Sequence, residues 1–281
     1  MTAEEQTNIR NFVEGLATSV IMKPSARDEQ AALGPSDLAD KCDLCVGRKI
    51  AASLHMGSPP VRNFSMKAWN GTAVHEKMER DLPSLYSGAE LEVTIDVAHV
   101  PGIGLIRGHA DLYLPRKKTL VDYKTTDLKK LKGYQKDAGP GSYTQGMSAT
   151  EREVLRDLKK RDRAGLLTGD DEIKQLVALS ARSDAHSGGV PQEYMGQTML
   201  YLYGLRAMGR EADYAVLLFI PRDSNNVSDI WAASCAYRPD VAQAVLNRAA
   251  SLAEIVRKGL VRELVAHSGC WTCSIRPRLS R

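Results

Sequence analysis

Two short predicted strands with a basic connection between them constrain this chain more than any other feature. The first strand spans residues 103–114 and the second is the apolar run 119–121. Three basic residues connect them, Arg116, Lys117 and Lys118. A connection this short joins antiparallel neighbours, so the sequence predicts a β-hairpin at this point of the chain.

Two carboxylates and one ammonium converge on this hairpin. Asp111 and Asp122 lie on adjacent strands, and Lys124 shares the face of Asp122 because strand side chains alternate with period two. Mg²⁺ prefers one or two carboxylates together with water and substrate phosphate, so the pattern predicts a hard-cation centre of the nuclease type. Glu92, on a predicted strand at 91–97, could reach the same end of the sheet. The alternative is an ordinary surface hairpin, since Asp-x-Lys occurs by chance in many proteins.

The overall composition is that of a soluble globular protein. The 281 residues are 43% hydrophobic and 26% charged, and no stretch approaches the ~20 apolar residues of a membrane span. The N-terminus lacks the basic start and apolar core of a signal peptide, so we expect a cytoplasmic protein. A net charge of +4 permits a polyanionic partner without requiring one.

Four of the five cysteines form two pairs of the C-x-x-C type. These are Cys42 with Cys45, and Cys270 with Cys273. In a cytosolic chain such pairs indicate a thiolate-bound metal and not a disulfide framework. Cys235 lies in an apolar predicted strand and is expected to be a small buried hydrophobic residue.

Helical and strand patterns alternate along the rest of the chain. Helices are predicted at 4–22, at 36–54 with Ser36 as the cap, from Ser65 onward, at 191–208 and at 240–267, and further strands at 214–220 and 229–237. The expected organisation is N-terminal helices with the first cysteine pair (1–60), a first core half (61–126), an inserted lid or arm (127–190), a second core half (191–240), and a C-terminal helix with the second cysteine pair (241–281).

Four motifs in this order resemble the RecB-like branch of the PD-(D/E)xK nucleases. They are Gly71-x-x-x-His75, Gly108-x-x-Asp111, Asp122-Tyr-Lys124-Thr and Gln197-x-x-x-Tyr201. With flanking cysteines, the pattern is similar to the iron–sulfur members of that branch, which include the CRISPR-associated exonuclease, its bacteriophage homologues and AddB-type nuclease domains. The resemblance covers roughly residues 36–275. It implies an α/β fold of the restriction-endonuclease-like type, with a mixed sheet flanked by helices and a helical annex that carries the cysteines.

The resemblance also implies roles for individual residues. Asp111, Asp122, His75 and the backbone carbonyl of Tyr123 would bind Mg²⁺ or Mn²⁺. Lys124 would position or deprotonate the attacking water and offset charge in the transition state.

Two further residues, Gln197 and Tyr201, would orient the substrate and brace the lysine. For His75 the alternative is an ordinary histidine on a helix surface. For Tyr201 it is simple core packing.

Three lysines follow the second strand of the hairpin. Lys129, Lys130 and Lys132 either contact DNA phosphates or form a solvated face, and the sequence leaves both interpretations open.

The cysteine spacing departs from the family pattern, which places one cysteine before the histidine motif and three near the C-terminus. This chain has two and two. Tetrathiolate sites hold either zinc or an iron–sulfur cluster. Zinc ribbons bring their pairs from roughly 15–20 residues apart. Here the pairs are more than two hundred residues apart, which favours a [4Fe–4S] cluster over Zn²⁺.

The predicted function is metal-dependent hydrolysis of DNA by an exonuclease that acts on single-stranded ends. DNA is the expected partner, together with recombination or CRISPR-adaptation proteins, and no membrane is expected. One alternative is a non-catalytic DNA-binding subunit that retains the fold. A second is a zinc-stabilised scaffold whose motif matches arise by chance.

Overall fold

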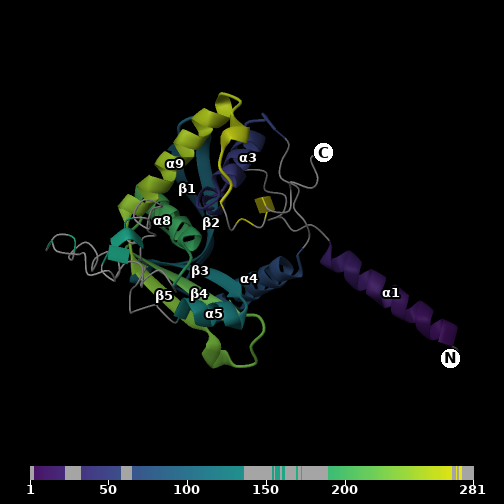
Figure 1. Ribbon diagram of the computed structural model, residues 1–281. Coiled ribbons are helices and arrows are strands. Elements are labelled where there is room, and N and C mark those ends of the chain that lie inside the picture. Colours follow the sequence, from purple (N-terminus) through teal and green to yellow (C-terminus); the bar gives the residue numbers. More distant parts are fainter. Residues whose placement is uncertain are drawn as a thin grey trace.

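The computed structural model describes residues 3–22, 33–57, 65–135 and 189–267, with single positions at 154, 156–158, 160–161, 169, 172, 270 and 272–273. Figure 1 shows a sheet with helices around it, and one helix that extends away from the rest. The helices are α1 (Ala3–Ile21), α2 (Pro35–Leu38), α3 (Asp43–Ser53), α4 (Met66–Leu85), α5 (Leu128–Gln135), α8 (Gln192–Ala207) and α9 (Pro239–Arg257). The strands are β1 (Glu90–Val100), β2 (Gly104–Leu114), β3 (Thr119–Thr126), β4 (Tyr214–Pro221) and β5 (Trp231–Ala236), with short 3-10 turns η1 (Pro115–Lys117), η2 (Val227–Asp229) and η3 (Val261–Glu263).

The five strands form one mixed sheet in the order β1-β2-β3-β4-β5. Strands β1, β2 and β3 are an antiparallel meander, as the sequence predicts, and β4 pairs antiparallel with β5. Strands β3 and β4 are parallel, so the chain must cross over between them, and α8 lies on this connection. The α/β fold with helices flanking a mixed sheet is therefore confirmed.

The main core lies between one face of the sheet and helices α8, α9 and α3. Large side chains such as Ile95, Leu217 and Phe219 are fully buried there. Helix α8 approaches β1 so closely at Gly204 that a Cβ on this residue would lie 2.5 Å from Ile95 Cγ2. Glycine at this position therefore sets the distance between the helix and the sheet.

Helix α4 covers the opposite face of the sheet more lightly. A second, smaller cluster is centred on Leu112, Val121 and Tyr123, with Met78 and Leu82 of α4 packed against it. Ser65 caps this helix as predicted, because its hydroxyl accepts a hydrogen bond from the N–H of Ala68 at the start of α4.

Two predicted helices have different ends in the structure. The helix expected from Ser36 to residue 54 is two helices, α2 and α3, and Cys42 is the N-cap residue of the second. Helix α9 ends at Arg257, about ten residues before its predicted end. Gly259 adopts a left-handed φ of 77°, and the N–H groups of Gly259 and Leu260 close the helix end with the bonds of a Schellman motif.

Helix α1 has an apolar stripe of the predicted helical spacing. Its side chains at Phe12, Leu16 and Val20 are more than half exposed. Most of the segment predicted as a lid or arm (127–190) lies outside the described residues, and helix α5 lies at its start. No helix in the described ranges is long and apolar enough to cross a membrane.

Candidate active site and cysteine cluster

Helix α4 positions His75 over the end of the hairpin. A Cβ on Gly71, one helical turn earlier, would lie only 3.0 Å from Thr125 Oγ1, so glycine permits this close approach of α4 to β3. The His75 ring packs edge-on against the ring of Tyr123, with centroids 5.6 Å apart and an interplanar angle of 72°. These contacts direct His75 toward β2.

Three potential metal ligands meet at this point. Ligand atoms of His75, Glu92 and Asp111 all lie within 4.8 Å of one another, and His75 Nδ1 is 2.9 Å from Asp111 Oδ1. Asp111 is buried and the other two are partly buried. One imidazole and two carboxylates in a sheltered position form a set that can hold a divalent cation.

Glu92 joins this group through an unusual backbone conformation. Its φ is +46°, which non-glycine residues rarely adopt within a strand. In a regular strand Leu91 and Val93 would lie on the same face of the sheet. Here Leu91 packs with the smaller cluster on one face, while Val93 lies in the main core on the other face. The neighbouring strand reverses at the facing position, between Ala110 and Leu112.

Asp111 separates the two strands of the hairpin. The pairing of β2 with β3 runs from Leu114 opposite Thr119 to Leu112 opposite Val121. Beyond this pair the N–H of Tyr123 donates a hydrogen bond to Asp111 Oδ2 at 2.7 Å. The side chain of Asp111 thus replaces a backbone carbonyl of β2 as the acceptor. This contact fixes the backbone of Tyr123 beside the ligand group, while metal binding by the Tyr123 carbonyl stays a prediction.

Asp122 and Lys124 face helix α8 and not the histidine. Lys124 Nζ lies 2.6 Å from Asp122 Oδ2 and donates to Gln197 Oε1 at 2.9 Å. Burial raises the pKa of the Asp122 carboxyl, the nearby ammonium of Lys124 opposes this shift, and the charge of Asp111 adds to it. The structure thus places Asp122 next to the lysine and groups Glu92 with His75 and Asp111.

Gln197 and Tyr201 lie one turn apart on α8, as their spacing predicts. The Gln197 amide donates to Asp122 Oδ1 and to the hydroxyl of Tyr201, both at 3.3 Å. Burial raises the pKa of Tyr201, so its phenol stays neutral. The Tyr201 ring also packs where Gly108 leaves room, since a Cβ on Gly108 would lie 2.8 Å from Tyr201 Cε1. Tyr201 therefore packs in the core and also contacts the polar network.

The three lysines after the hairpin are exposed on α5. Lys129, Lys130 and Lys132 thus lie on a helix that directly follows β3, and their role in binding phosphate stays a prediction.

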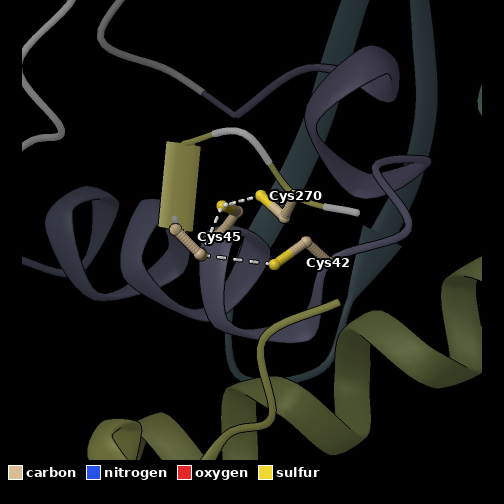
Figure 2. Close-up of side chains that lie close together, drawn as sticks. Cys42, Cys45 and Cys270 are labelled. Carbon is tan, nitrogen blue, oxygen red and sulfur yellow. Dashed lines mark hydrogen bonds between the residues drawn. The ribbon is translucent and has the colours of Figure 1, made fainter. Parts of the chain in front are cut away.

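The two cysteine pairs come together although they are far apart in the sequence (Figure 2). Cys45 Sγ lies 3.5 Å from Cys270 Sγ and 3.4 Å from Cys273 Sγ, and Cys42 Sγ lies 3.5 Å from Cys273 Sγ. The fifth cysteine, Cys235, is buried on β5 as predicted. Four converging sulfurs can bind one metal centre, and they join α3 to the C-terminal segment.

Arg248 of α9 fixes the loop that presents the first pair. Its Nε donates to Asp43 Oδ1 at 2.7 Å and its Nη1 donates to the carbonyl oxygen of Asp40 at 2.7 Å. The N–H of Cys42 in turn donates to Asp40 Oδ1 at 2.9 Å. The backbone around Cys42 is therefore held by contacts that do not require a bound metal.

The thiols of this cluster differ in acidity. Burial opposes ionisation of Cys42, but the backbone N–H groups of His267 and Cys45 outweigh it and lower the pKa of Cys42 to about 7. Burial and neighbouring sulfurs raise the pKa of Cys45, and burial raises the pKa of Cys273 to about 11. A cation favours thiolates at such a site, because positive charge stabilises the deprotonated sulfur.

No protein-family model matches this chain, and no curated protein sequence matches it. Several solved structures are similar to this chain at low identity, among them the following three. SSO0001 is 16% identical, with 89% of this chain and 86% of that chain covered and a TM-score of 0.36. LHK-Exo in complex with dAMP is 11% identical over 83% of this chain and 91% of that chain, with a TM-score of 0.40. A phage-related exonuclease from Haemophilus somnus 129PT is 12% identical over 83% of this chain and 96% of that chain, with a TM-score of 0.41.

Similarity at this level carries no argument about function, so the function is inferred from the residues of the site. The fold and the site define an α/β protein with a mixed sheet and two groups of metal-ligating side chains.

Proposed function

We propose that this chain is a metal-dependent deoxyribonuclease of the PD-(D/E)xK type, acting as an exonuclease. One observation carries the proposal. The ligand group of His75, Glu92 and Asp111 lies near the ammonium of Lys124, which the buried Asp122 and the partly buried Gln197 hold in place. This combination suits phosphodiester hydrolysis, because a cation can bind the phosphate while the ammonium stabilises the charge that develops on it.

The cation in this proposal is Mg²⁺ or Mn²⁺, held by His75, Glu92 and Asp111. When bound, it supplies Lewis-acid polarisation of the scissile phosphate and lowers the pKa of a water molecule. The imidazole of His75 favours Mn²⁺, because Mg²⁺ selects oxygen ligands. Asp122 lies outside this ligand group, next to Lys124, and direct binding of the cation by Asp122 stays a prediction of the sequence motif.

The protein side chains supply the remaining chemistry. Asp122 and Gln197 hold the Lys124 ammonium in one place, so it can orient a water molecule and stabilise the charge that develops on the phosphate. Tyr201 holds Gln197 through the hydroxyl contact. Burial of Asp122 and Tyr201 keeps water away from this side of the site, which strengthens each electrostatic contact.

The proposed substrate is DNA with free ends, and single-stranded DNA is the form to test first. The support is the order of the four sequence motifs together with the exposed lysines of α5, which follow the active-site strand directly. Partners in recombination, repair or CRISPR-like adaptation are part of the same proposal.

A nuclease assay on end-labelled single- and double-stranded DNA, with and without Mn²⁺, tests the activity. Asp111→Asn and Lys124→Met should each lower the cleavage rate by at least about a hundredfold, as removal of one preorganised charge-stabilising group does in other enzymes. Lys117→Met is the matched control, since Lys117 is exposed on the turn η1. Full activity of Asp111→Asn or Lys124→Met contradicts the proposal.

The same assay distinguishes the nuclease from the alternative, a non-catalytic DNA-binding subunit. A binder retains DNA affinity in a mobility-shift experiment while the wild-type protein cleaves neither substrate with any divalent cation. An intact set of Asp111, Asp122 and Lys124 supports the enzyme, because a binder has no need for a buried carboxylate–ammonium pair.

For the cysteine cluster we propose a structural metal centre with no part in bond cleavage. The donor set suits both [4Fe–4S] and Zn²⁺, but the spacing of the sulfurs supports the single ion. Zn–S bonds of about 2.3 Å in a tetrahedron place neighbouring sulfurs about 3.8 Å apart, close to the 3.4–3.5 Å separations here. A cube of four irons and four sulfides needs more room between its thiolates.

Metal analysis of protein purified without air distinguishes the two. One equivalent of zinc in colourless protein supports the single ion. Brown protein with about four irons and broad visible absorbance supports the cluster that the family resemblance implies, and it requires the sulfurs to move apart. Protein without metal and with four reactive thiols removes both.

A further inference from the structure

A tyrosine outside the four sequence motifs lies beside the active-site lysine. Lys124 Nζ is 4.9 Å from the centre of the Tyr194 ring, within the range in which the face of an aromatic ring attracts a cation. Tyr194 precedes Gln197 by three positions on α8, and Tyr201 follows four positions later. One face of the helix therefore presents all three side chains to the end of β3.

The ring of Tyr194 is held by other rings. Its centroid lies 6.1 Å from that of Phe219, and the Phe219 ring stacks on Trp231 at 5.3 Å and contacts Tyr134 at 5.5 Å. Phe219 is fully buried on β4, directly beside Lys124 in the parallel register. The aromatic cluster thus fixes the ring face relative to the lysine.

An aromatic ring can hold the lysine ammonium in place without occupying one of its N–H donors, which a third polar partner cannot do. Lysine has a flexible stem and three N–H donors. Here Lys124 donates one hydrogen bond to Gln197 and forms an ion pair with Asp122. Asp122 already offsets the charge of the ammonium, so another carboxylate would take a further N–H donor and add a negative charge that repels the phosphate. The ring face attracts the ammonium without accepting a directional bond, which leaves one N–H for an oxygen of the substrate. Burial raises the pKa of Tyr194, so its ring stays neutral.

We propose that Tyr194 is a positioning residue that holds the Lys124 ammonium in its catalytic orientation through the face of its ring. The catalytic part of this inference rests on the nuclease function proposed above. The contact itself does not, so it can be tested separately.

The contact is tested by NMR on the full chain. A ring face beside the ammonium shifts the ε-methylene protons of Lys124 upfield, and the resonance is identified by its absence in Lys124→Met. The upfield shift should persist in Tyr194→Phe, which keeps the ring, and should disappear in Tyr194→Leu. An ordinary lysine shift in the wild-type protein overturns the inference, whether or not the protein cleaves DNA.

The catalytic role is tested with phenylalanines of increasing fluorination at position 194. Fluorine withdraws electron density from the ring face while the ring size changes little, so packing alone would leave the rate unchanged. If Tyr194 acts through its ring face, kcat should fall stepwise, by on the order of tenfold for the trifluorinated ring, with little change in KM. The same series at Tyr214, an exposed ring at the start of β4 that lies outside this cluster, should leave kcat unchanged.

The outcomes separate the two proposals. A wild-type protein that shows the shifted lysine resonance but cleaves no DNA overturns the nuclease function and, with it, the catalytic role of Tyr194. Cleavage that is insensitive to fluorination at 194 overturns the role of Tyr194 and leaves the nuclease function standing.

Discussion

Opening the cysteine clasp, the contact between the two C-x-x-C pairs, should cost more stability than any single substitution in the core. The perturbation is the double variant Cys270→Ser/Cys273→Ser, which removes both C-terminal ligands. Cys45 and Cys270 are 225 positions apart, and cross-linking a loop of this length restricts the unfolded chain by about 5 kcal/mol in the chain-entropy model. This term applies when the metal stays bound to the unfolded chain. When the metal dissociates on unfolding, the loss is instead the free energy of metal binding to the folded protein.

Urea unfolding of metal-loaded protein, followed by circular dichroism without air, measures the effect. A loss of this size corresponds to a shift of the midpoint by roughly 1.5 to 2 M urea. Cys235→Ser is the matched control, because Cys235 is also buried but lies on β5 outside the cluster. Equal midpoints for the double variant and the wild-type protein, or an equal loss in the control, would refute the reasoning.

Substitutions at three further positions test other features. Gly204→Ala should lower the free energy of unfolding by about 1–3 kcal/mol or more, because the new methyl group overlaps Ile95; thermal unfolding measures this. Glu92→Gln and Glu92→Gly should both weaken Mn²⁺ binding in a calorimetric titration. The glycine variant should be the more stable of the two by about 1 kcal/mol, since it relieves the left-handed backbone. Arg222, and then Lys67, lower the pKa of Asp127 from 3.8 to about 2, so this carboxylate stabilises the fold above pH 4 and loses the effect as pH falls through 2. The difference in melting temperature between the wild-type protein and Asp127→Asn should therefore be constant above pH 4 and vanish near pH 2.

Local patterns predicted most of the sheet. The alternation at 91–97, the basic turn at 116–118 and the apolar run at 214–220 each correspond to an element of the structure. Strand β3 continues to Thr126, five residues past the apolar run that marked it. Asp122 and Lys124 are polar, but they satisfy each other inside the protein, and the sequence alone does not show such pairing.

The features that the sequence did not predict depend on tertiary contacts. Nothing in an alternating strand marks the reversal at Glu92, because that reversal needs the neighbouring strand to reverse as well. The break between α2 and α3 depends on Arg248, which lies about two hundred residues away and binds the carbonyl group of Asp40. The end of α9 was visible in principle, since Gly259 follows a run of good helix formers.

Tyr194 shows a second limit of motif reading. Tyr194 is not among the site residues predicted from the sequence, although its spacing of three from Gln197 puts it on the same helix face. Its ring packs among other rings, as the ring of a core residue does. Only the position of Lys124 over that ring distinguishes it.

The clasp also determines when this protein can finish folding during synthesis. A ribosome adds about 5–20 residues per second, so Cys270 follows Cys45 by roughly 10 to 45 s. During that interval the first pair has been synthesised, while its two partners are not yet made. The half-formed site can meet oxidants or the wrong metal during translation. Cells starved of the correct metal should therefore accumulate newly made chains that are degraded before they mature, whereas chains that have closed the clasp persist.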